Sequence, residues 1–314
     1  ERILNKNTVR YFRDNCYDNL DNSFTGYYSG ELPESYTDDA FRSGTGVSFD
    51  WHNGLLSPNQ PMFASSVWDN CWEGIRKCNL ALLYLPQSTA PKDMVSDQDI
   101  AWYCDEVKIL RAWYHFSLIR IFGPVPFIEE AFSPDFMDWD QLTRPTFDEI
   151  STRIVAEIDE VISAGNLPLR WQVSADYSKV NLAVAHALKS RVLLYNASIL
   201  NNPAADQAKW QNAAAAAQAC LNSILPEYGL LPMSEYADLF DQASSVLNKE
   251  IILRSSTNDA ATMNNKNGVD LKSLKSSTQS SNCGAVPTQE LVDCFELTSG
   301  ILPVVHYNNT EHTS

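Results

Sequence analysis

Residues 106–116 read EVKILRAWYHF, and residues 122–126 read FGPVP. In the first stretch Val107, Leu110 and Tyr114 recur every three or four residues, which is the spacing of the apolar face of an α-helix. In the second stretch Gly123 precedes a proline, and this order stops a helix because glycine suits the C-terminal cap and proline cannot continue it. The two stretches predict a helix over about 97–122, followed by an extended segment.

Helical spacing continues on both sides of this helix. Apolar residues recur every three or four positions near residues 9–20 and over about 62–86. Thr146 and Glu149 have the spacing of a capping box, in which each side chain bonds the other residue's backbone N–H. They predict a further helix that ends near Gly165.

Two alanine-rich segments follow, over about 179–200 and 206–225. Small side chains let two helices approach closely, so these segments predict an antiparallel helix pair that turns at residues 201–203. Stacked pairs of this length are typical of tetratricopeptide-like solenoids. We therefore predict a mainly all-α fold, a tetratricopeptide-like solenoid of helix pairs with long surface loops.

Two segments lack helical spacing, residues 21–61 and 256–287. Loops of this length in a compact domain are usually functional or disordered. The second segment is rich in Ser, Thr, Asn and Lys and contains no aromatic residue, so it is either flexible or a hydrogen-bonding wall. The first is dense in aromatic residues, which argues against disorder: Phe24, Tyr27, Tyr28, Tyr36, Phe41, Phe49 and Trp51.

Composition limits the classes of partner. The chain has 314 residues, of which 44% are hydrophobic, and 39 acidic against 23 basic residues give a net charge of −16. Nucleic acid and anionic membrane surfaces would repel such a chain. The charge fits a neutral ligand or a basic partner, or it serves only to keep the protein in solution. No apolar stretch reaches the roughly 18 residues of a transmembrane helix.

The sequence contains no recognisable catalytic, metal or cofactor motif. The five histidines are scattered, without the spacing of a helical zinc site, and no Gly-x-Ser-x-Gly motif or phosphate-binding glycine loop occurs among the 12 glycines. None of the seven cysteines forms Cys-x-x-Cys, and we interpret most of them as small core residues. We expect no catalytic residue, metal or cofactor.

Paired carboxylates are the one chemical feature shared with glycosidases, which need two of them facing each other across a cleft. In a chain with 39 acidic residues such pairs arise easily, and solvated loop charge is the alternative interpretation. The candidates are Asp38 with Asp39, Glu129 with Glu130, and the group Asp135, Asp138 and Asp140.

Binding of a sugar has better support, from the stretch FDWHNG at residues 49–54. The flat indole of Trp51 can stack on the apolar C–H face of a pyranose, while Asp50 and Asn53 can bond its hydroxyl groups. The alternative is that Trp51 folds down onto the helices as an anchor for the loop. His52 is expected to be a bystander.

Six motifs, read in chain order, resemble those of one known family. Together they are similar to the SusD/RagB family of outer-membrane nutrient-binding lipoproteins. The motifs are WDNCWEGIRKCN at 68–79, EVKILRAWYHF with FGPVP at 106–126, RPTFDEI at 144–150, ALKSRVLLY at 187–195, NKEII at 248–252 and PTQELVD at 287–293.

The resemblance implies an α-superhelix with tetratricopeptide-like helix pairs. It also implies a cell-surface lipoprotein of the outer membrane that is not an enzyme. Such proteins capture an oligosaccharide or polysaccharide, in some members a peptide, and deliver it to a SusC-like TonB-dependent transporter. In the starch-binding member, aromatic residues on a loop before the early Trp-rich helix form a stacking arc, with Asn and Arg nearby. By position, Trp51, Asn53 and Arg42 match that pattern, so the expected ligand-binding residues are Trp51, Asn53, Asp50 and Arg42.

The chain also departs from the family pattern. We expect one SusD-like domain over residues 1–314, without the lipidated cysteine before Glu1 that anchors the family in the membrane, and shortened after the PTQ motif. Segment 256–287, which supplies binding residues in the family, has no aromatic residue here. Two alternatives stay open beside glycan capture: a peptide-binding relative on the same scaffold, and a helical glycosidase.

Overall fold

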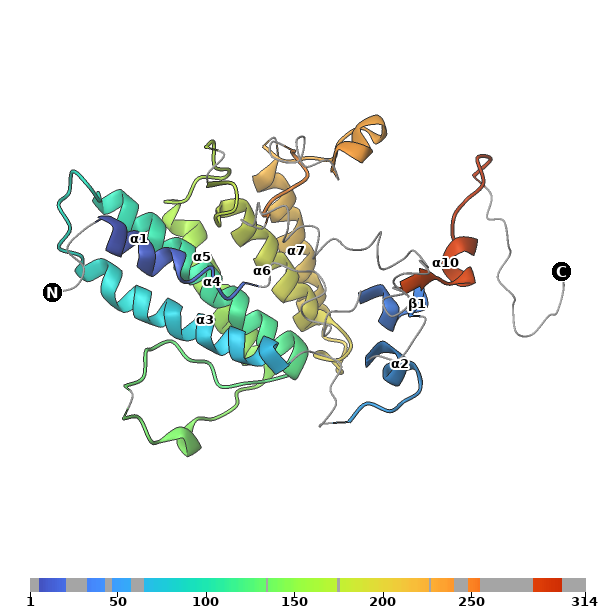
Figure 1. The fold of residues 1–314 in the computed structure, drawn as a ribbon, viewed down its shortest axis with the longest axis horizontal. Helices are drawn as coiled ribbons and strands as arrows, with labels where there is room; N and C mark the ends of the chain where they lie inside the picture. The colour runs from blue at the N-terminus through green and yellow to red at the C-terminus, as the bar shows by residue number, and fades with distance from the viewer. Residues whose placement is uncertain are drawn as a thin grey trace, which may run out of the picture. The chain divides into compact units, whose positions relative to one another are not determined.

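The computed structural model describes residues 6–20, 33–42, 47–57, 65–133, 135–173, 176–225, 227–239, 248–254 and 285–300 (Figure 1). The chain divides into two compact units. The helical unit comprises residues 1–20 and 68–256, and the paired-segment unit comprises residues 21–67 and 257–314. That residues 1–314 form a single domain stays a prediction.

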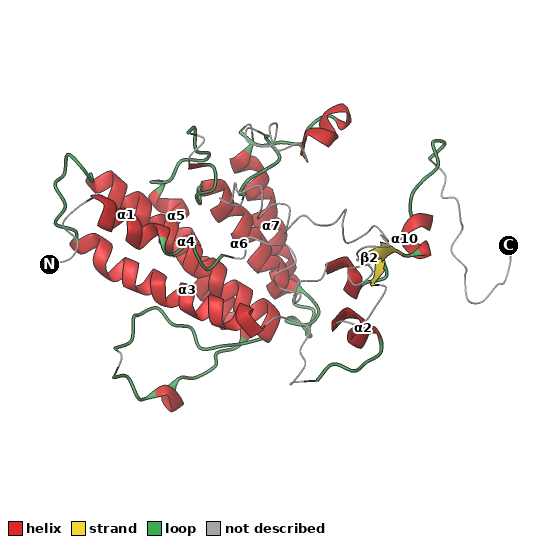
Figure 2. Ribbon diagram, viewed as in Figure 1, coloured by secondary structure: helices red, strands yellow, loops and turns green. Residues whose placement is uncertain are grey.

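The helical unit follows the predicted order of elements (Figure 2). Helix α4 packs on α5, α5 on α6 and α6 on α7, and α1 packs on α4. This mainly helical architecture confirms the predicted fold class. The α-helices described in this unit are α1 (Lys6–Asp14), α3 (Ser65–Tyr84), α4 (Asp97–Phe122), α5 (Phe147–Ala164), α6 (Leu182–Ala197) and α7 (Gln207–Ile224), with short 3-10 turns η3 (Leu85–Gln87), η4 (Trp139–Gln141) and η6 (Met233–Leu239).

Side-chain caps define where the two central helices begin. At α4 the Ser96 hydroxyl accepts the Asp99 N–H (3.1 Å), and the Asp99 carboxylate accepts the Ser96 N–H (2.8 Å). Thr146 and Glu149 form the same reciprocal pair at α5, which confirms the predicted capping box. Gly123 ends α4 at a φ of +75°, a conformation that glycine adopts without steric cost.

Buried polar groups on α4 attach α1 to the unit. Glu106 is fully buried and accepts two hydrogen bonds from Arg13, at 2.9 and 3.1 Å, and one from the Tyr17 hydroxyl at 2.5 Å. Burial raises the pKa of Glu106, and the positive charge of Arg13 opposes that rise. Since a buried charge is costly unless it is paired, this cluster fixes α1 in one position on α4.

Helix α3 approaches α4 closely where Gly74 faces Tyr114. Tyr114 is buried, and its hydroxyl donates to the Cys16 carbonyl (2.7 Å). A Cβ atom placed at Gly74 would lie only 2.6 Å from the Tyr114 ring. Helices α3 and α4 can therefore pack together at this point only because Gly74 has no side chain.

The α6–α7 hairpin confirms the predicted alanine-rich pair. Its turn is held by Asn202, which is buried, donates to the Asp206 carbonyl (3.0 Å) and accepts the Asp206 N–H (2.9 Å). Most cysteines also lie where core residues lie: among the described residues Cys16, Cys71, Cys78 and Cys220 are buried, and Cys104 is half-buried.

The paired-segment unit joins two parts of the chain that are far apart in sequence. Strands β1 (Ala40–Arg42) and β2 (Ala285–Pro287) form an antiparallel ladder in which Phe41 lies opposite Val286. Thr288, after β2, donates its N–H to the Asp39 carbonyl (2.9 Å). The unit also contains η2 (Pro33–Tyr36), α2 (Val47–His52) and α10 (Gln289–Asp293).

Segment 21–61 is therefore not a continuous loop. Its described residues contain a 3-10 turn, a strand and a helix, and the strand pairs with the end of segment 256–287. Most of segment 256–287, and the aromatic residues Phe24, Tyr27 and Tyr28, lie outside the described residues.

Candidate functional site

The predicted ligand-binding tryptophan lies on the short helix α2. The helix ends at Gly54, whose φ is +67°. The Leu55 N–H bonds the Asp50 carbonyl (2.8 Å), and the Gly54 N–H bonds the Trp51 carbonyl (3.0 Å). These two bonds form a Schellman motif, which satisfies carbonyl groups at the end of a helix. Trp51 is therefore presented by a closed helix end and not by an open loop.

Four aromatic side chains among the described residues of this unit are exposed, one of which is Phe295. We call the three on or next to α2 the α2 aromatic surface: Phe41, Phe49 and Trp51. Their exposed fractions are 42%, 37% and 45%. The buried ring of Tyr36 supports Trp51 edge-on, with ring centroids 6.5 Å apart. Trp51 therefore packs on Tyr36 of its own unit and exposes almost half of its area. That it binds a ligand stays a prediction.

His52 connects two elements of the unit. Its Nε2 lies 2.9 Å from the Ser35 carbonyl oxygen, and its ring packs 5.8 Å from the Phe41 ring. These contacts tie α2 to η2 and hold Phe41 in place. His52 thus packs against one ring of the α2 aromatic surface, and its expected lack of a role in ligand binding stays a prediction.

The four predicted binding residues are only partly gathered. Asp50 and Asn53 are three residues apart, so they share one side of α2, whereas Trp51 lies about 100° further round the helix from Asp50. The Asn53 amide donates to the Phe49 carbonyl (2.7 Å), which uses one of its hydrogens within the helix end. Arg42 pairs with Ala285 in the ladder, and its side chain lies outside the described atoms.

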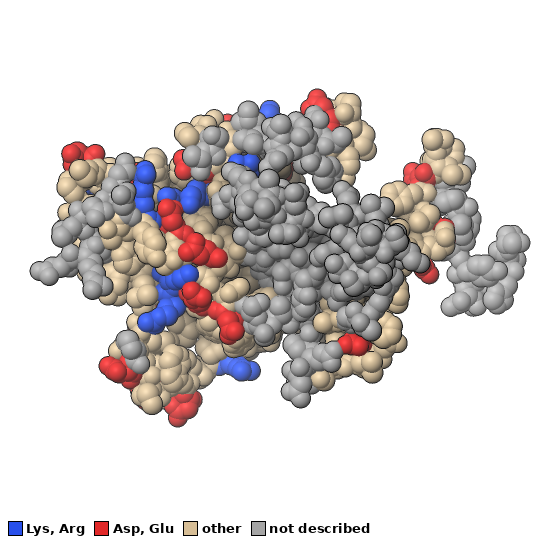
Figure 3. Space-filling view, viewed as in Figure 1, with Lys and Arg blue, Asp and Glu red and all other residues tan. Residues whose placement is uncertain are grey.

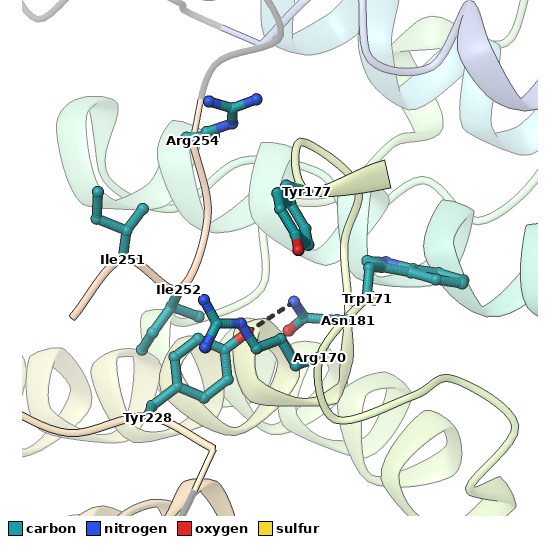
Figure 4. A pocket seen from close by; sticks show the side chains of 8 residues that line it. All are labelled: Arg170, Trp171, Tyr177, Asn181, Tyr228, Ile251, Ile252 and Arg254. Carbon is teal, nitrogen blue, oxygen red and sulfur yellow. Dashed lines mark hydrogen bonds between the residues drawn. The ribbon is translucent and has the colours of Figure 1, made fainter. Parts of the chain in front are cut away.

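A second cluster of aromatic and basic residues, in the helical unit, encloses too little space for a sugar. Arg170, Tyr177, Tyr228 and Arg254 are among the eight residues that line it (Figure 4). Asn181 donates to the Tyr228 hydroxyl (3.1 Å), and the Arg170 guanidinium lies 5.1 Å from the centre of the Tyr228 ring. The cavity measures about 20 Å³, about the space that one water molecule needs.

Charged side chains of the helical unit are mixed in sign. Figure 3 shows Lys and Arg interspersed with Asp and Glu over the visible face of this unit. Several are ion-paired, such as Lys108 with Glu160 (3.0 Å) and Lys189 with Asp159 (2.6 Å). Within the part of the chain that the structure describes, no group of His, Cys, Asp and Glu is placed to hold a metal ion, and no helix is long and apolar enough to cross a membrane.

Comparison with known families gives one match, over residues 4–194. The matching family is SusD-like and is described as starch-binding and associating with the outer membrane. The match covers more than half of the chain, includes the motifs at 68–79, 106–126 and 144–150 in full, and includes all but the last residue of the motif at 187–195. Comparison with curated proteins finds none that matches.

Solved structures show the same fold. A SusD-like protein from Bacteroides fragilis has 19% identity and a TM-score of 0.74, and the alignment covers 99% of this chain and 56% of that one. A SusD superfamily protein from Parabacteroides distasonis has 22% identity and a TM-score of 0.72, covering 93% and 60%.

A third structure holds a ligand. Surface glycan-binding protein A from Bacteroides thetaiotaomicron, solved with laminarihexaose, has 22% identity and a TM-score of 0.59, covering 79% of this chain and 48% of that one. The chain therefore spans about half to three fifths of the length of these solved relatives.

Proposed function

This chain belongs to the SusD-like family, and from that premise we propose that it captures an oligosaccharide at the cell surface and passes it to a SusC-like TonB-dependent transporter. The observation that carries the proposal is the α2 aromatic surface. Phe41, Phe49 and Trp51 remain exposed although each would gain free energy by burial, and Trp51 is the one whose indole can stack on a sugar ring next to Asp50 and Asn53.

The proposed contacts follow from the geometry of α2. Trp51 stacks on the apolar face of a sugar ring, and Asp50 and Asn53 bond hydroxyl groups from the adjacent side of the helix. Arg42 is proposed as a further contact because it lies on β1, next to Phe41. The family description and the laminarihexaose complex of a relative support a glycan as the ligand.

We further propose that the protein binds without catalysis and sits at the outer membrane, held by a lipid anchor. Asp50, next to Trp51, lies on α2. A glycosidase would need a second carboxylate that faces it across a cleft. Capture followed by transfer to a transporter requires release of the intact ligand, so the absence of turnover is part of the proposal.

Substitution of Trp51 tests the proposal directly. Trp51→Ala removes the stacking platform, and a central aromatic contact is commonly worth more than about 1 kcal/mol of binding free energy. We expect the affinity for the bound oligosaccharide, measured by isothermal titration calorimetry, to fall by about fivefold or more. A panel that contains maltohexaose and laminarihexaose supplies the ligands.

Trp210→Ala is the matched control, because Trp210 is 42% exposed on α7 and belongs to the other unit. It should bind like the wild-type chain. If Trp51→Ala also binds like the wild-type chain, the site lies elsewhere. If peptides bind and no oligosaccharide does, the ligand class is wrong.

A further inference from the structure

Two buried cysteines of the helical unit lie against each other, although they are 62 positions apart in the sequence. Cys16 follows α1 and Cys78 lies on α3. Both residues are 0% exposed, and their thiols are free. The two thiols lie close enough to share a hydrogen bond. Cys16 and Cys78 therefore form a thiol pair enclosed in the core.

Contacts on both sides of the thiol pair fix how its two segments align. The Phe12 ring packs on the Tyr84 ring, with centroids 5.8 Å apart, and Lys77 donates to the Asn19 side chain (2.7 Å). These contacts join α1 and the turn after it to α3, which runs beside α1 in Figure 1. One contact lies four residues before Cys16 and the other three residues after it, so the meeting of the thiols does not depend on a single contact.

The environment of Cys16 suits a bridge to α3. Its Sγ donates to the Phe12 carbonyl (3.2 Å), and its own carbonyl accepts the Tyr114 hydroxyl (2.7 Å). A disulfide brings the two sulfur atoms to about 2.05 Å, closer than two thiols in contact. Because α1 ends at Asp14, Cys16 lies in a turn, and the turn can supply this movement without bending a helix.

The nearest cysteine in sequence to Cys78 cannot take the place of Cys16. Cys71 lies seven residues before Cys78 on α3, which separates them by about 10 Å along the helix axis. This distance is too long for a disulfide in a straight helix. Cys220 lies on α7, and Cys294 follows α10 in the other unit.

The compartment in which a protein folds decides whether such a pair stays reduced. The matching family is described as associating with the outer membrane. Thiols are kept reduced in the cytosol, whereas disulfides form and persist in the bacterial envelope. A chain at the proposed location passes through that envelope, so its thiol pair meets oxidants while the chain folds.

We propose that Cys16 and Cys78 form a disulfide that joins α1 to α3 when the chain folds in the cell envelope. The two thiols lose two protons and two electrons as the sulfur–sulfur bond forms, and the disulfide of a thiol oxidase or of an oxidised low-molecular-weight thiol is reduced to two thiols. The bond secures α1, a helix of nine residues that is too short to be stable by itself.

Oxidation has to precede the closing of the core. Burial, together with the neighbouring Cys16 thiol, raises the pKa of Cys78. Only a thiolate attacks a disulfide, so the folded, reduced chain should react slowly and the refolding chain quickly. Since the bond is enclosed once it has formed, it should also resist reductants until the chain unfolds.

Peptide mapping of the full chain tests the proposal. The reduced, urea-unfolded chain is refolded with reduced and oxidised glutathione, its remaining thiols are blocked with iodoacetamide, and it is digested with trypsin without reduction. Trypsin cuts after Lys and Arg, so Cys16 falls in peptide 14–42, Cys78 in 78–92 and Cys71 in 43–76. We expect peptides 14–42 and 78–92 to be joined, and to separate on reduction.

Thermal unfolding gives a second measurement. The oxidised wild-type chain should unfold at a temperature roughly 5–10 °C above that of the reduced chain, because the bridge closes a long loop in the unfolded state. Cys16→Ala and Cys78→Ala should show no difference between the two conditions. Each variant is compared with itself, so the effect of lost packing cancels. Cys71→Ala is the matched control, which removes another buried cysteine of α3 and should keep the difference.

Two results would overturn the proposal. The first is recovery of peptides 14–42 and 78–92 apart, each with its cysteine alkylated, after oxidative refolding. The second is a link from 78–92 to another cysteine peptide. The same map of the chain exported to a bacterial periplasm gives the answer without a refolding step. Neither assay uses a glycan, so a negative result leaves the proposed binding function unaffected.

Discussion

His115 lies fully buried on α4 between two backbone groups. Its Nδ1 is 3.0 Å from the Arg111 carbonyl oxygen, and the Ile128 N–H donates to its Nε2 at 3.2 Å. Since Nε2 must accept, the imidazole is neutral with its proton on Nδ1. Burial lowers the pKa of His115 to about 3, and the nearby Arg111 charge adds to that effect.

This depressed pKa predicts loss of stability in acid. Above pH 6.5 the imidazole is neutral in both states, so it adds no pH dependence. Below pH 6.5 His115 becomes protonated in the unfolded chain, whereas in the folded chain it stays neutral until the pH approaches about 3. Stability therefore falls as pH falls, by up to roughly 1.4 kcal/mol per pH unit from this group.

The variant His115→Asn isolates the contribution of His115 to the pH dependence of stability. The variant should be less stable than the wild-type chain at pH 7, because a core contact is lost. Between pH 7 and pH 5.5, however, its free energy of unfolding should fall by about 1 kcal/mol less than that of the wild-type chain. Urea unfolding at both pH values measures the difference, and the other titrating groups cancel in the comparison. Equal losses in the two chains would show that His115 is accessible to protons when folded.

Individual residues show what sequence pattern can and cannot predict. Trp51 could be singled out because an aromatic residue beside Asp and Asn has a chemical meaning by itself. The roles of Glu106 and Arg111 could not be predicted, because their partners Arg13 and Glu157 lie far away in sequence.

Helix boundaries were predictable where caps are encoded locally. The bounds of α4 and α5 match the prediction because Ser96, Thr146 and Gly123 act within one helical turn. The start of α6 was set too early, at about 179. The missed signal was Asn181, an N-cap whose side chain accepts the Val184 N–H (3.0 Å). Helix α2 was missed altogether, because it lies within segment 21–61, where no helical spacing was recognised.

The contact between α3 and α4 gives a prediction about Gly74. Alanine is preferred over glycine in a helix by about 1 kcal/mol, so Gly74→Ala would stabilise an isolated α3. In the protein the added methyl group overlaps the Tyr114 ring, and overpacking of a core typically costs about 1–3 kcal/mol. We expect net destabilisation, measured by urea unfolding.

A double variant checks the cause of this effect. In a Tyr114→Leu background the ring is absent, so Gly74→Ala should become neutral or stabilising relative to Tyr114→Leu alone. Gly74→Ala that stabilises the chain with Tyr114 present would show that the two helices do not approach as closely as described.

The pairing of β1 with β2 could not be predicted from the sequence pattern. Strands β1 and β2 have three residues each and come from opposite ends of the chain, so no local periodicity marks them. Thr288 of the PTQ motif connects the elements next to this ladder. Its N–H bonds the Asp39 carbonyl, and its hydroxyl caps α10 by accepting the Leu291 N–H (3.3 Å). The two segments without helical spacing thus share one unit, which carries the α2 aromatic surface.

The central claim is that this chain binds a glycan and leaves it intact. Titration of the wild-type chain with a panel of oligosaccharides, followed by prolonged incubation with the best ligand and an assay of reducing ends, tests it most directly. We predict saturable binding in the micromolar to millimolar range and no new reducing ends. Binding to no glycan, or cleavage of the bound glycan, would contradict the account.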